Sequence, residues 1–111
     1  MTSYDRALEL VDKLTANGIS ATCDPRSATP PCVLVTPPRR TYDLACGYTA
    51  AWSLWALVPG VGNADAFKAL DALVDDVADV FPILRAELQS YALSPDNPPL
   101  PAYRIDLEEG I

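Results

Sequence analysis

The sequence contains no histidine and only three cysteines, Cys23, Cys32 and Cys46, in 111 residues. Without histidine or a Cys-x-x-Cys pair, the usual ligand sets for zinc are missing. A catalytic cysteine would need a base such as histidine, and no other pair of residues supports hydrolysis or group transfer. We therefore expect no metal site, no cofactor and no enzymatic activity, and we expect reduced thiols that pack as small hydrophobic side chains.

Long hydrophobic runs are also absent. The longest, residues 50–61, is interrupted by Ser53, Pro59 and Gly60, whereas a membrane-spanning helix needs about 20 apolar residues. The first residues lack a basic region followed by an apolar core, so we expect no signal peptide. Since hydrophobic residues make up 50% of the chain, we predict one globular domain over residues 1–111.

Basic residues are few: 8 lysines and arginines stand against 15 acidic residues, which gives a net charge of −7. Such a surface repels the phosphates of nucleic acids, so DNA and RNA are poor candidates for tight ligands. Two interpretations remain open. The charge serves solubility, or it forms an acidic surface that lets DNA pass without adhering.

The first helix is bounded by clear signals. Thr2 and Asp5 have the spacing of a capping box, and Gly18 after Asn17 is a strong stop. Its mixed polar face is typical of a helix that covers a core rather than a membrane surface. The predicted buried face consists of Tyr4, Ala7, Leu8, Val11 and Leu14, with Leu10 at its margin.

Two short strands are predicted next. Ile19–Cys23 reads as the first, and the apolar, β-branched segment Cys32–Thr36 reads as a buried second strand, which Pro37 and Pro38 end. Arg39 and Arg40 follow directly, and we place them at a loop tip.

Apolar residues occupy every even position from Tyr42 to Val58. A period of two indicates either one very long strand, or two strands in line with a bend at Gly47, and a hairpin curled within the monomer remains an equal alternative. One face is apolar throughout, and the other becomes apolar only towards Trp55 and Leu57. A strand this long in a small domain is expected to project beyond the core, where it could reach another subunit.

A second helix follows the turn Pro59–Gly62, with Asn63 as the expected N-cap. The glycines lack the spacing of a phosphate-binding loop. Phe67, Leu70, Val74, Val77 and Phe81 share the predicted buried face. The acidic face, which we expect to line a channel or a neighbouring subunit rather than to bind a cation, comprises Asp65, Asp71, Asp75, Asp76 and Asp79.

Two strands are predicted after Pro82, one over Leu84–Leu93 and one around Tyr103–Leu107, followed by a short acidic tail, Glu108–Ile111. The predicted fold is therefore α+β: a mainly antiparallel β-sheet with two α-helices packed on one face, in the order α-β-β-β-α-β(-β), with one long projecting strand or hairpin.

The long strand that leads through VPGVGNADAFKALDALVDDV into the second helix, together with the element order and the chain length, resembles the tail terminator proteins of long-tailed actinobacterial phages. The segment Pro59–Ala66 carries most of the likeness, and the wider comparison is with the lambda-type tail terminator family. The resemblance implies a virion protein that forms a homo-hexameric ring at the head-proximal end of the tail. Such a ring caps the tail tube, stops its polymerisation, docks the head connector, and passes DNA through its channel without tight binding.

A ring assembled head to tail uses two different patches on each subunit. We place Arg39 and Arg40 at one patch, facing acidic residues such as Glu108 and Glu109 of a neighbouring protein. Two other functions stay open. One is a head–tail connector, or neck, ring protein. The other is an acidic regulator that mimics DNA and would be a monomer or dimer.

Overall fold

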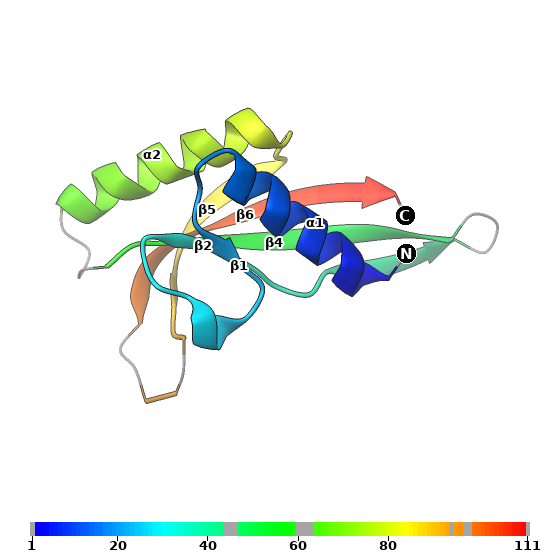
Figure 1. Ribbon diagram of the computed structural model, residues 1–111, viewed down its shortest axis with the longest axis horizontal. Helices are drawn as coiled ribbons and strands as arrows, with labels where there is room; N and C mark the ends of the chain where they lie inside the picture. Colours follow the sequence, from blue (N-terminus) through cyan, green and yellow to red (C-terminus); the bar gives the residue numbers. More distant parts are fainter. Residues whose placement is uncertain (1, 44–46, 60–63, 94, 97–98, 111) are drawn as a thin grey trace.

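The computed structural model describes residues 2–43, 47–59, 64–93, 95–96 and 99–110, and it forms one sheet with both helices on the same side (Figure 1). The α+β prediction is confirmed. The elements are α1 (Ser3–Ala16), β1 (Ala21–Thr22), a 3-10 turn η1 (Pro25–Ser27), β2 (Cys32–Val35), β3 (Arg39–Asp43), β4 (Gly47–Leu57), α2 (Ala64–Val80), β5 (Arg85–Tyr91) and β6 (Leu100–Gly110).

The start of α1 is fixed by the predicted capping box. The Thr2 hydroxyl accepts a hydrogen bond from the Asp5 backbone N–H (3.1 Å), and the Asp5 carboxylate accepts one from the Thr2 N–H (3.2 Å). These bonds satisfy donors that the first turn of a helix otherwise leaves unpaired. The chain leaves the helix through Gly18, whose φ of +82° suits glycine.

The sheet has the strand order β1-β2-β4-β6-β5, with β3 paired to the free end of β4. All pairs are antiparallel except β1 with β2. The strands β3 and β4 form a hairpin, so the alternation from Tyr42 to Val58 spans two antiparallel strands. The interpretation as one continuous strand is wrong, and the hairpin alternative is right. β4 and β6 each have 11 residues, slightly more than the usual ~3–10.

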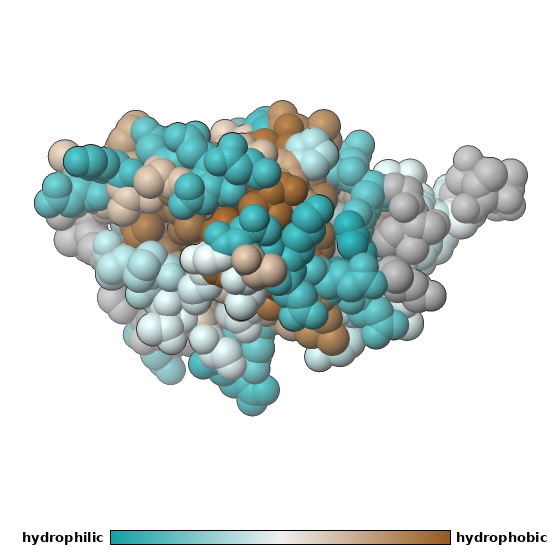
Figure 2. Space-filling model, turned by 45° about the horizontal axis from the view of Figure 1, so that its top comes forward, coloured by the Kyte–Doolittle hydropathy of each residue, from teal (hydrophilic) through white to brown (hydrophobic). Residues whose placement is uncertain are grey.

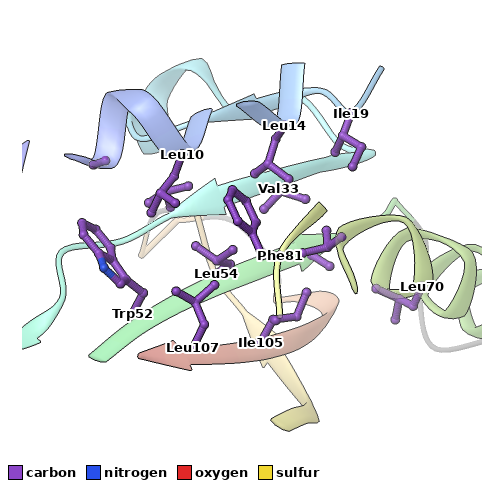
Figure 3. Close-up of a cluster of buried hydrophobic side chains, with 14 of the residues drawn as sticks. Leu10, Leu14, Ile19, Val33, Trp52, Leu54, Leu70, Phe81, Ile105 and Leu107 are labelled. Carbon is purple, nitrogen blue, oxygen red and sulfur yellow. The ribbon is translucent and has the colours of Figure 1, made fainter. Parts of the chain in front are cut away.

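The main core lies between the helices and the helix-facing side of β4 and β6 (Figure 3). Leu10 and Leu14 of α1 point towards Leu54 of β4, and all three side chains are at most 1% exposed. The predicted buried face of α1 is rotated from the observed one. Leu10 is central rather than marginal, whereas Tyr4 (64% exposed) and Leu8 (38%) face outwards.

The predicted face of α2 is right except at its start. Leu70, Val77 and Phe81 are buried and Val74 packs against the core, whereas Phe67 is 54% exposed and Ala66 is buried instead. The helical period was therefore right, but sequence alone did not centre the face of α1, because the crossing of each helix over the sheet selects which residues touch it. The predicted N-cap, Asn63, and the turn before it lie outside the described residues.

A second, smaller core covers the opposite face of the sheet at one end. Buried Cys32, Leu34, Leu57 and Ala102 form it, and the rings of Trp55 and Tyr91 pack over it with centroids 4.7 Å apart. The prediction that the second face is buried only near Leu57 is thereby confirmed. Burial also raises the pKa of the Cys32 thiol and keeps it neutral, and Cys23 is also a free thiol.

Two other local predictions are wrong. Arg39 and Arg40 lie in β3, paired with Ala51 and Ala50 of β4, and not at a loop tip. Glu108 and Glu109 belong to β6, where they pair with the same two alanines, and do not form a tail. Both errors have one cause: charged residues can occupy a strand when its backbone is paired and their side chains reach solvent.

We expect Leu54→Ala to lower the free energy of unfolding by about 2–5 kcal/mol, because it opens a cavity under both helices. Phe67→Ala is the matched control on the exposed side of α2, and it should change stability much less. Urea denaturation monitored by circular dichroism measures both. Equal losses for the two variants would contradict the described core.

The capping box makes stability depend on pH. Hydrogen bonds from the Thr2 backbone and hydroxyl lower the pKa of Asp5 below its ordinary value of 3.8. A lowered folded-state pKa adds stability above the unfolded pKa, and this contribution is lost as the pH falls through the folded value. We expect Asp5→Asn to destabilise the protein at neutral pH, with the difference from wild type shrinking below pH 3.8. A difference independent of pH in urea titrations would refute this assignment.

Candidate functional site

The sheet face that the helices leave open carries a shallow groove of about 540 Å³. It is lined mainly by charged residues of three strands, with Arg39 from β3, Arg85 from β5 and Arg104 from β6. At the other end of this face, Ala28, which follows η1, and Leu93, which follows β5, pack against the small core. Concave surfaces with convergent polar groups are where ligands and partners most often bind.

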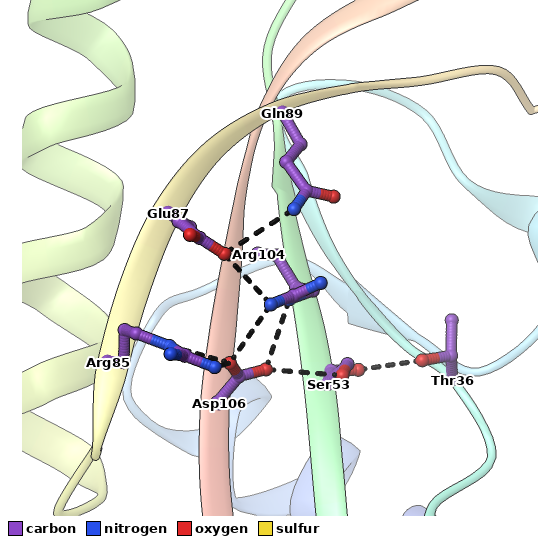
Figure 4. A network of polar contacts seen from close by, with 7 residues as sticks. All are labelled: Thr36, Ser53, Arg85, Glu87, Gln89, Arg104 and Asp106. Atoms are coloured by element: carbon purple, nitrogen blue, oxygen red, sulfur yellow. Dashed lines mark hydrogen bonds and ion pairs between the residues drawn. The ribbon is translucent and has the colours of Figure 1, made fainter.

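A network of polar contacts forms one wall of the groove (Figure 4). Strand register places Ser53, Asp106 and Arg85 side by side in one row, and Arg104 and Glu87 in the next. The Asp106 carboxylate forms an ion pair with the guanidinium of Arg85 at 3.2 Å and accepts a hydrogen bond from the hydroxyl of Ser53 at 3.3 Å. Arg104 reaches Glu87 at 2.9 Å.

One atom of this network lacks a hydrogen bond. The Nε of Arg104 is buried, and although it lies 3.3 Å from an oxygen of Asp106, its N–H does not point at that oxygen. The Nε contact is therefore an ion pair by distance only, whereas the Nη2 of Arg104 donates a hydrogen bond to the other Asp106 oxygen at 3.4 Å. Each charge in the wall is compensated by a neighbour from the same chain, which makes the network a brace between β4, β5 and β6.

The Ser53 hydroxyl donates a hydrogen bond to the Asp106 carboxylate, which also contacts the guanidinium groups of Arg85 and Arg104, and the chain has no histidine. Two neighbouring positive charges favour the ionised form of a carboxylate and make it a weak base. Among the described residues no three His, Cys, Asp or Glu side chains converge as they would around a metal ion. The arrangement presents polar and charged groups that can recognise other polar groups, and its one serine contacts a carboxylate already held by two arginines.

The predicted interface residues fall into two cross-strand rows. Arg39 and Glu108 flank Ala51 on the groove face, and Arg40 and Glu109 flank Ala50 on the helix face. The structure thus brings the four residues together within one chain. Their role at a subunit interface stays a prediction.

Glu109 is engaged inside the chain. Its carboxylate binds the guanidinium of Arg6 through two hydrogen bonds of 2.8 and 2.9 Å, and it also accepts the indole N–H of Trp52 at 3.0 Å. The same bonds raise the pKa of Arg6. Glu109 therefore links α1 to β4 and β6, a role that could not be predicted from the sequence because the three partners are far apart in the chain. Its neighbour Glu108 is exposed.

The β3–β4 hairpin extends past the N-terminal end of α1 and past the end of β6 (Figure 1). On its helix-facing side the guanidinium of Arg40 lies 4.8 Å from the ring centroid of Tyr48 and donates to the Tyr42 hydroxyl at 3.1 Å. That hydrogen bond raises the pKa of Arg40. The Tyr48 hydroxyl in turn lies 3.0 Å from the hydroxyl of Ser3, so the first paired residues after the turn of the hairpin are linked to the start of α1.

The acidic face predicted for the second helix is present on α2, and Figure 2 shows hydrophilic residues along this helix (upper left). All five of its aspartates are exposed, and within the described part of the chain none makes an ion pair. They follow the helix as a row and do not converge on a point. The face is therefore a strip of unpaired negative charge, comprising Asp65, Asp71, Asp75, Asp76 and Asp79.

No protein-family model, curated protein or solved structure was found to match this chain. Among its described residues no helix is long and apolar enough to cross a membrane.

We expect Glu109→Ala to cost about 1–3 kcal/mol of unfolding free energy, since it leaves the buried Trp52 indole N–H without its acceptor and Arg6 without its main partner. Glu108→Ala is a control one residue away, with the same change of charge, and should stay within about 0.5 kcal/mol of wild type. Thermal and urea unfolding of the two variants provide the comparison. If Glu108→Ala were the more damaging change, the described contacts of Glu109 would be wrong.

Proposed function

We propose that this protein is a structural subunit of a phage tail: a tail terminator that forms a ring, caps the tail tube and provides the docking face for the head connector. The main support is the β3–β4 hairpin, which carries exposed side chains beyond the helix-covered core. Tyr42 is 66% exposed there, and Arg39 and Arg40 are exposed beside it. A monomer gains no burial from these side chains, whereas an assembly can bury them against a neighbour.

The distribution of charge is consistent with a ring around DNA. Two positive side chains lie on the hairpin, and the unpaired aspartates lie along α2. If α2 faces the channel, its row of carboxylates repels the duplex and keeps the DNA from adhering as it passes. The hexameric copy number, the virion location, and the partners (the tail tube protein and the head connector) come from the resemblance of the sequence to tail terminators and form part of the proposal.

The groove supports the same conclusion by its chemistry. Its charged side chains compensate one another, and the carboxylate beside the Ser53 hydroxyl is held by two arginines, so we propose a structural rather than a catalytic role. A connector at the head side of the joint would use similar surfaces. The position of the protein in purified virions, determined by labelling, separates a ring at the tube end from one at the neck.

We expect the purified protein, or the protein mixed with tail tubes, to form closed rings in negative-stain images and in mass photometry. The double variant Arg39→Glu/Arg40→Glu should lose ring formation and head joining, because it reverses both charges on the hairpin. Arg26→Glu/Lys68→Glu makes the same change in net charge at exposed positions away from the hairpin, and it should assemble normally.

Two results would contradict the proposal. If rings and head joining are unchanged in the hairpin variant, the hairpin is not an assembly surface. If the wild-type protein is a monomer at every concentration, with or without tubes, and binds a basic protein instead, it is the acidic regulator rather than a terminator.

A further inference from the structure

Within the described part of the chain three strands have a single partner, and one of them, β1, has only two residues. The two longer ones are β3, which pairs with β4, and β5, which pairs with β6. They lie at opposite edges, because β6 occupies one side of β4 over Thr49–Leu57 while β3 and β2 share the other side. An open strand presents unpaired backbone N–H and C=O groups that can accept a strand from another chain.

Exposed hydrophobic side chains mark the same two edges. Tyr42 of β3 is 66% exposed, Leu88 of β5 is 60% exposed, and Leu84, just before β5, is 67% exposed. The Leu84 N–H bonds to the Asp106 carbonyl of β6 at 2.8 Å, so the ladder extends to this residue. The remaining large exposed hydrophobic residues, Tyr4, Leu8 and Phe67, lie on helices.

The three edge residues also share one face. Tyr42 pairs with Tyr48, and Leu88 pairs with Tyr103, both partners lying on the side that bears the helices. If β3 of one copy lay beside β5 of a second, with the helices of both copies on the same side, Tyr42 would cover Leu84 or Leu88. These contacts would bury the apolar surface that one copy leaves in water.

The opposite face of the two strands is complementary in charge. There β3 presents Arg39, which has no ion-pair partner among the described residues, and β5 presents Glu87, whose side chain is 49% exposed despite its contact with Arg104. Neither strand contains a proline that would block pairing, and β5 carries one arginine and one glutamate, so its edge does not repel a basic strand. Both faces thus favour the same occupant.

We propose that the outer edge of β5 receives the β3 strand of a second copy, so that the sheet continues from one subunit to the next. Each copy carries one β3 edge and one β5 edge, on opposite sides of its sheet, so the contact is head-to-tail and can be repeated around a ring. The closure into a ring rests on the proposed function. The strand contact does not, because it requires only two copies of this chain.

Cross-linking between two differently tagged copies tests the contact. One copy carries Tyr42→Cys and the other Leu88→Cys, both with Cys23→Ser and Cys46→Ser, while Cys32 is retained because it is buried (1% exposed). We expect a short bis-maleimide to join one copy of each kind when the two are co-expressed, and neither kind to itself. Self-linking of the Leu88→Cys copy would show a symmetric contact and overturn the proposal.

A second variant tests the apolar contact. Leu84→Lys/Leu88→Lys changes side chains already exposed in the single copy, so the fold should persist, and self-association should weaken about tenfold or more. Leu8→Lys/Phe67→Lys makes the same chemical change at exposed helix positions and should assemble like wild type. The melting temperature of each variant confirms that it is folded.

The results separate the two proposals. Rings that survive the Leu84→Lys/Leu88→Lys change, with no cross-link between Tyr42→Cys and Leu88→Cys, overturn the strand contact and leave the terminator role standing. A cross-link in a protein absent from the head–tail joint upholds the contact and overturns the terminator role. A wild-type protein that never self-associates overturns both.

Discussion

Burial of the helix-facing side of β4 is the constraint on which the other elements depend. Ala50, Trp52, Leu54 and Ala56 are each at most 1% exposed, and burying a large apolar side chain stabilises a fold by about 1.5–3 kcal/mol. The same strand pairs with β2, β3 and β6. Both helices therefore take their places from this one strip of side chains, and the hairpin projects because β4 is longer than the layer that covers it.

Charge is distributed around this core in two distinct ways. Most of the basic side chains are used within the chain: they pair with carboxylates or lie over aromatic rings, as seen for Arg6, Lys13, Arg26, Arg40, Arg85 and Arg104. Exposed pairs of this kind contribute little to stability, but they neutralise most of the positive charge of the chain. The net charge of −7 is consequently left mainly on surfaces such as α2, where the aspartates have no counterion from the chain. This separation supports an assembly role more strongly than any single residue does.

Much of the fold could be predicted because it follows from local rules. The capping box at Thr2 and Asp5, the stop at Gly18 and the strand at Cys32–Val35 depend on residues close together in sequence. The hairpin could not be separated from a single long strand, because a period of two is the same in both and the turn has no strong local signal. The groove was not foreseen either, since Arg85, Arg104 and Asp106 converge only through the register of two strand pairs.

The sequence by itself determined the class of the fold, the number of helices, the apolar stripe of β4 and the acidic face of α2. Each of these follows from apolar and polar residues that alternate with the period of a strand, two residues, or of a helix, 3.6 residues. It also determined that the chain lacks histidine and with it the most common general base. Tertiary structure alone decided which residues of α1 face the sheet and that Glu109 holds Arg6 and Trp52. It also decided that, among the described residues, β3 and β5 each pair on one side only, at opposite edges. Those outcomes depend on contacts between segments that are distant in the chain. Local sequence patterns are compatible with several arrangements of these segments, and side-chain packing and strand register determine which one forms.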